Sequence, residues 1–76
     1  MINVGFGNMI SESGIVAVIH PDSAPVKRLI SDAKSDNNLI DATYGRKTRS
    51  VIIMNTKQII LASVQPETIS ARINEE

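Results

Sequence analysis

The sequence predicts a small α+β domain in the order ββαβββα, in which a mostly antiparallel sheet carries one main helix and a short C-terminal helix. Three observations lead to this prediction. Short apolar runs bounded by glycine, asparagine, serine or proline are typical of strands. One segment instead repeats its apolar residues with the spacing of a helix. The length of 76 residues limits the chain to one domain, residues 1–76.

Two strands are expected before the main helix. Residues Ile2–Gly7 alternate apolar side chains with small or polar ones, which is the pattern of a half-buried strand. A turn follows at Ser11–Gly14. Residues Ile15–Ile19 are apolar at every position, as in a strand that is buried on both faces. The segment His20–Asp22 ends this second strand.

The main helix is expected to begin near Ser23 or Ala24, because Pro25 suits the first turn of a helix. It is expected to end at Asp36–Asn38. Its apolar residues fall at i, i+3, i+4 and i+7, and so form one stripe: Val26, Leu29, Ile30 and Ala33.

Three further strands are expected at Leu39–Thr43, Val51–Met54 and Ile59–Val64. Residues 44–49 would join the first two of these strands as a basic β-hairpin loop. Pro66 then opens the short last helix, which is expected to place its isoleucines on one side.

Several of these strands are apolar on both faces, whereas a strand with one exposed face alternates. The stripe of the main helix covers about one face of the sheet, and a terminal helix this short is marginal alone. We therefore expect a homo-oligomer that hides the second face; the alternative is a sandwich folded over itself. The residues expected in the core or the oligomer interface are Ile15, Val16, Val18, Val51, Ile53 and Ile60.

The composition limits the chemistry and the cellular location. The chain has no cysteine and a single histidine, which argues against disulfides, thiolate chemistry and a metal site. No secretory signal is visible at Met1–Ile10, and no apolar run reaches the ~20 residues that span a bilayer. We expect a cytoplasmic protein that does not contact a membrane.

Catalytic motifs are also missing. Gly5-Phe6-Gly7 resembles the start of a dinucleotide fingerprint, but Ile10 stands where the third glycine belongs. His20 has no evident nucleophile partner, and Asp41 is expected to pair with a cation or to orient the adjacent turn. We expect no catalytic residues, no cofactor, no small-molecule substrate and no enzyme activity.

The strongest functional feature is the stretch Tyr44–Arg49, which holds three cations in four positions. No Asp or Glu occurs from Ala42 through Pro66, although the formal net charge of the chain is zero. One reading is a solubilising turn between two apolar strands. The other is an anion-binding projection for a nucleic-acid backbone. In that second reading the contacting residues are Arg46, Lys47, Arg49 and Tyr44, extended by Lys27 and Arg28 if the main helix faces the same way.

Four segments together carry a resemblance to a known family: Asn3–Asn8, Asp22–Ile30, Leu39–Arg49 and Ile60–Thr68. They resemble, in register over nearly the whole chain, the RemA family of extracellular-matrix regulatory proteins. The resemblance implies a small cytoplasmic, nucleoid-associated protein that binds double-stranded DNA and activates transcription of biofilm-matrix operons. It also implies a homo-oligomer closed into a ring of about seven or eight subunits.

The resemblance assigns the DNA contact to the basic pair after Tyr44-Gly45, which is Arg46 and Lys47 here. The family more often has arginine at the second position, and lysine keeps the charge but not the bidentate geometry. A further family arginine corresponds to Gly14 in this chain. The alternatives to duplex DNA are RNA, or an acidic protein partner docked on an oligomeric scaffold.

Overall fold

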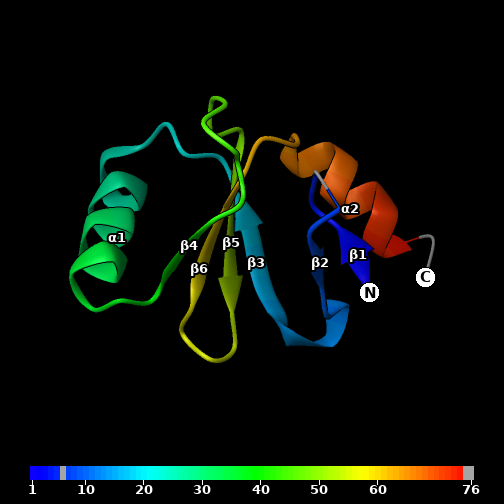
Figure 1. The fold of residues 1–76 in the computed structure, drawn as a ribbon, viewed down its shortest axis with the longest axis horizontal. Helices are drawn as coiled ribbons and strands as arrows, with labels where there is room; N and C mark the ends of the chain where they lie inside the picture. Colours follow the sequence, from blue (N-terminus) through cyan, green and yellow to red (C-terminus); the bar gives the residue numbers. More distant parts are fainter. Residues whose placement is uncertain (6, 75–76) are drawn as a thin grey trace.

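The computed structural model describes residues 1–5 and 7–74. Two helices pack on either side of a central sheet, and a small hairpin lies near the second helix (Figure 1). In chain order the elements are β1 (Ile2–Asn3), β2 (Met9–Ile10), a 3-10 turn (Glu12–Gly14), β3 (Ile15–Ile19), α1 (Ala24–Ser35), β4 (Leu39–Asp41), β5 (Ser50–Met54), β6 (Ile59–Ala62) and α2 (Pro66–Asn74).

The central sheet has the strand order β3-β5-β6-β4. Strand β5 is antiparallel to both β3 and β6, whereas β4 runs parallel to β6. The predicted α+β class, with a mostly antiparallel sheet and two helices, is therefore confirmed. The expected first strand is shorter than predicted: Ile2 and Asn3 pair with the added strand β2, and Phe6 lies outside the described residues.

The prediction that residues 44–49 form a β-hairpin loop is wrong. Strands β4 and β5 are separated in the sheet by β6, so the segment between them crosses one end of β6. The reason is that Leu39 and Asp41 pair in parallel with Ile59 and Leu61. A parallel pairing needs a crossover connection, which the chain supplies through the β5–β6 hairpin.

Helix α1 covers one face of the sheet. Ser23 caps it, accepting a hydrogen bond at its Oγ from the Val26 backbone N–H at 3.4 Å, and Pro25 sits in the first turn as expected. Ala33 is buried against the sheet with Val51, Ile59 and Leu61. The predicted stripe therefore faces the core, with Leu29 at its border and 36% exposed.

The second face of the sheet is covered by the same chain. Val4, from the segment after β1, and Ile69 of α2 are fully buried against Ile52 and Ile60. This face therefore does not need a partner subunit to cover it, as in the alternative of a chain folded over itself, and the homo-oligomer stays a prediction. Helix α2 is stable here because docking Ile69 supplies what an isolated short helix lacks.

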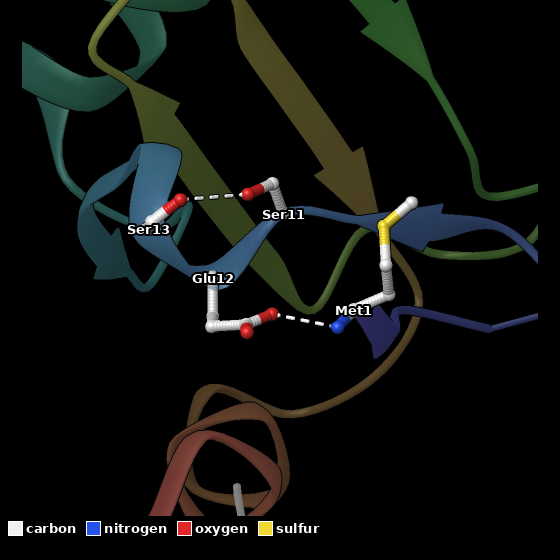
Figure 2. Close-up of polar contacts among 4 residues, drawn as sticks. All are labelled: Met1, Ser11, Glu12 and Ser13. Atoms are coloured by element: carbon white, nitrogen blue, oxygen red, sulfur yellow. Dashed lines mark hydrogen bonds and ion pairs between the residues drawn. The ribbon is translucent and has the colours of Figure 1, made fainter.

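Polar contacts link the N-terminal hairpin (β1 and β2) to the 3-10 turn that follows it and to helix α2. The Met1 amino group lies 2.8 Å from Glu12 Oε2, and the Ser11 and Ser13 hydroxyls lie 2.9 Å apart (Figure 2). The Arg72 guanidinium of α2 donates a hydrogen bond to the Asn3 carbonyl. Of these three contacts, the bond from Arg72 is the one that joins β1 to α2.

The residues predicted for the core or an oligomer interface fall into three groups. Val51 and Ile60 are buried, and Ile15, Val18 and Ile53 are half-buried against the two apolar clusters. Val16, on the edge strand β3, is 65% exposed.

Candidate nucleic-acid interface

The basic stretch begins with a tight turn that the sequence dictates. The Arg46 backbone N–H donates to the Thr43 carbonyl at 3.1 Å, which closes a four-residue turn. The two central residues, Tyr44 and Gly45, have positive φ values of 55° and 80°. Positive φ at both central positions is the signature of a type I′ turn, and glycine adopts it at little cost.

Asp41 fixes the start of this turn. Its Oδ1 accepts hydrogen bonds from the Thr43 hydroxyl at 2.5 Å and from the Thr43 backbone N–H at 2.9 Å. These bonds favour the charged carboxylate, the side-chain bond most, so the pKa of Asp41 is lowered. The expectation that Asp41 orients the turn is confirmed.

The three cations of the stretch gather around one hollow. Arg46, Lys47 and Arg49 line a space of about 620 Å³ together with Gly5, Ser63 and Val64. The Arg49 backbone N–H donates to the Ala62 carbonyl at 2.8 Å, which anchors the end of the loop to β6. The cations therefore stand on a backbone that is held at both ends.

A second, smaller hollow adjoins the first. Lys47 and Arg49 also line this space of about 260 Å³, together with Pro21, Asp22, Thr48, Gln65 and His20. His20 Nε2 lies 3.1 Å from Glu67 Oε1, and both side chains are exposed. Lys47 and Arg49 thus form a cationic ridge between two concavities.

The start of α1 lies at the same end of the fold as the basic loop. Figure 1 shows the loop after β4, the N-terminal end of α1 and the N-terminal end of α2 at one end of the sheet. Lys27 and Arg28 occupy the first turns of α1 and are exposed. Helix N-termini carry a partial positive charge that favours anions. The six residues predicted to contact DNA therefore share one end of the molecule, with Tyr44 69% exposed.

Of the three remaining cations, Arg72 bonds to the Asn3 carbonyl, and the two lysines lie at the opposite end of the fold. Lys57 lies in the β5–β6 turn and Lys34 in the last turn of α1, both away from the basic loop (Figure 1). Gly14, at the position of a family arginine, also lies near that opposite end, where the Asn55 backbone N–H donates to its carbonyl at 2.8 Å. A Cβ at Gly14 would lie 3.0 Å from Met54 Cε, so a longer side chain there requires Met54 to move.

Other kinds of site find no support in the part of the chain that the structure describes. No group of three or more His, Cys, Asp or Glu side chains is placed to hold a metal ion. Within residues 1–5 and 7–74, no helix has both the length and the apolar character to cross a bilayer. An end of the fold that gathers cations and helix N-termini can bind phosphate groups.

Three residues that line the larger hollow were not predicted from the sequence: Gly5, Ser63 and Val64. None of them is charged, and all lie outside the basic stretch in the sequence. The signal that could have found Gly5 is its place in a glycine pair after the first strand, which marks a tight backbone approach.

Comparisons with known proteins agree with the resemblance. A family model described as "RemA-like: Extracellular matrix regulatory protein A-like" matches residues 1–73. A protein of Dictyoglomus turgidum, named a candidate regulatory protein, is 62% identical over 96% of this chain and 86% of its own length. A similarly named protein of Carboxydothermus hydrogenoformans is 55% identical over 96% of this chain and 84% of its own length. Another, of Trichormus variabilis, is 54% identical over 95% of this chain and 82% of its own length.

Proposed function

The chain belongs to the RemA-like family, and from this premise we propose that it is a DNA-binding transcriptional regulator that grips the duplex backbone through the basic loop, residues 44–49. A regulatory role agrees with the names of its relatives. We place it in the cytoplasm at the nucleoid, as an activator of biofilm-matrix genes.

The observation that carries the proposal is the grouping of cations at one end of the fold. Arg46, Lys47 and Arg49 line one hollow, and Lys27 and Arg28 lie in the first turns of α1, which begins at the same end of the sheet. Phosphate contacts from such groups position a protein on DNA but carry no sequence information directly. Choice of DNA then depends on repeated sites and on how readily the duplex bends.

We further propose that the functional form is a homo-oligomeric ring. The two edge strands of the sheet, β3 and β4, each expose a large aliphatic side chain, Val16 at 65% and Ile40 at 44%. Contact between opposite edges of successive subunits is a heterologous contact, which closes into a ring when the rotation permits. One loop with a few phosphate contacts binds weakly, and a ring makes each further contact effectively intramolecular.

The first test removes the charge of the basic loop. In fluorescence anisotropy with unrelated duplexes at low salt, Arg46→Ala/Lys47→Ala is expected to weaken binding at least tenfold on every sequence, because two phosphate contacts are lost in each subunit. Lys34→Ala/Lys57→Asn is the matched control, since it removes two charges from the opposite end of the fold. Asparagine suits position 57, where φ is 70°.

The affinity of Lys34→Ala/Lys57→Asn for duplex DNA should be within about twofold of the wild-type affinity, because this control keeps every proposed phosphate contact. Unchanged affinity in Arg46→Ala/Lys47→Ala would contradict the assigned interface. An equal loss in both double variants would show that only total charge matters. Wild-type protein that binds no duplex at low salt would favour an acidic protein partner instead.

A further inference from the structure

The hollow beside the basic loop has the composition of an anion pocket. Among residues 1–5 and 7–74, its lining combines three cationic side chains with Ser63, Gly5 and Val64, and includes no carboxylate. Its volume of about 620 Å³ falls in the range of about 300–1,000 Å³ that is usual for small-ligand sites. A duplex is far wider than this space and can only touch its rim.

The walls of the hollow are held in place before any ligand arrives. The Gly5 backbone N–H donates to Asn3 Oδ1 at 2.7 Å, and Gly5 has a φ of 113° that other residues rarely adopt. A Cβ at Gly5 would lie 3.3 Å from Val64 Cγ2 and 3.7 Å from Ser63 Oγ, so this wall needs glycine. The opposite wall is anchored by the bond from Arg49 to β6. Preorganised walls lower the cost of binding.

Three acidic residues of this end of the fold have other contacts or line another space. Asp41 accepts two hydrogen bonds from Thr43, and Glu67 pairs with His20. Asp22 lines the neighbouring hollow rather than this one. The charged side chains that line the larger hollow, among the described residues, are therefore all cationic.

We propose that this hollow binds a small phosphate compound with several adjoining charges, namely the polyphosphate chain of a free nucleotide or of inorganic polyphosphate. One strand of a duplex carries a single charge per about 3.4 Å of helix axis. A polyphosphate chain concentrates several charges within one pocket, which matches three converging cations better. Ser63 donates its hydroxyl proton to a phosphate oxygen.

Such a ligand regulates DNA binding, and this consequence rests on the proposed function. Arg46 and Lys47 are needed both by the polyphosphate and by the duplex, so the two compete for the same cations. The amount of free polyphosphate compound then sets how much of the protein is available to DNA.

Isothermal titration calorimetry of the DNA-free protein with sodium tripolyphosphate, at constant ionic strength, tests the pocket. We expect one site per chain, and orthophosphate at least tenfold weaker because it presents fewer charges. ATP, used as the second probe, should bind at least as tightly as tripolyphosphate if the phosphate chain enters the hollow. A titration in which tripolyphosphate shows no saturable binding would overturn the proposal.

Two variants locate the site, with folding checked by circular dichroism. Ser63→Ala should weaken tripolyphosphate binding several-fold through loss of one charge-assisted hydrogen bond, and should leave DNA affinity within about twofold. Arg49→Gln should weaken tripolyphosphate binding at least tenfold, whereas Lys34→Ala/Lys57→Asn should leave tripolyphosphate binding unchanged. Wild-type affinity for tripolyphosphate in both Ser63→Ala and Arg49→Gln would overturn the site.

Because these titrations contain no DNA, they separate the two proposals. Tripolyphosphate binding without duplex binding would refute the DNA-binding function and keep the pocket. Duplex binding that tripolyphosphate does not displace, beyond the effect of an equal ionic strength of NaCl, would refute the regulation.

Discussion

A few residues set the backbone conformation of the basic loop and so the position of its cationic side chains. Asp41 and Thr43 close the start of the loop, and Tyr44 and Gly45 turn the backbone through positive φ. Arg46 then emerges at the hollow and not along the strand. The charges of the loop were readable from the sequence, and so was the role of Asp41, because an aspartate two residues before a turn commonly accepts the local backbone N–H.

Removing the carboxylate of Asp41 should change stability in a pH-dependent way. Its pKa is lowered in the folded chain, so its stabilisation is complete above the ordinary aspartate pKa of about 3.9 and is lost as the pH falls through the lower folded pKa. Asp41→Asn should cost about 1 kcal/mol or less at neutral pH, since the side chain is exposed.

Urea unfolding of Asp41→Asn and wild type between neutral pH and pH 2 checks this expectation. The difference in free energy of unfolding should shrink below about pH 4. The matched variant is Asp32→Asn, because the Asp32 side chain accepts no hydrogen bond within the described residues. A difference that grows as the pH falls would contradict the assigned role.

At the scale of elements, the existence of strands and helices was predictable but their neighbours were not. Apolar runs located β3, β5 and β6, and Ser23 with Pro25 located the start of α1. The parallel pairing of β4 with β6 depends on contacts between segments distant in sequence, which no local pattern encodes. The hairpin assignment failed for that reason.

The covering of the second face of the sheet was also not predictable from local sequence patterns. A nine-residue α2 with few apolar positions is a weak sequence signal, yet Ile69 is fully buried in the cluster on that face. Packing against the sheet, and not helix propensity, stabilises this element. Helix length alone does not predict this stability, because the surface on which α2 docks comes from strands distant in the sequence.

Truncating Ile69 tests whether α2 holds the second face. Ile69→Ala should lower the free energy of unfolding by about 2–4 kcal/mol, because a cavity replaces a fully buried side chain. Leu29→Ala, at the exposed border of α1, is the control and should change it by less than about 1 kcal/mol. Urea unfolding at one protein concentration measures both; a loss below about 1 kcal/mol for Ile69→Ala would show that α2 is not a fixed part of the core.

At the scale of the molecule, the fold brings five of the eight Lys and Arg residues and two helix N-termini to one end of the sheet. The loop, the start of α1 and the hollow beside Gly5 meet there because three connections end at the same edge of the sheet (Figure 1). The sequence predicted which residues are cationic, but it could not show that the start of α1 and the basic loop lie at the same end of the sheet. That grouping is a property of the strand order.

The central claim is that many copies of one basic loop hold a duplex together, and the salt dependence of DNA affinity tests it most directly. One chain offers five cations at this end, Arg46, Lys47, Arg49, Lys27 and Arg28. A single chain can therefore give a slope of log K against log salt no steeper than about −0.9 × 5, or about −4.5. We predict a wild-type slope clearly steeper than this limit, and a shallower slope for Arg46→Ala/Lys47→Ala. A wild-type slope within the limit of one chain, or one that this double variant leaves unchanged, would contradict the account.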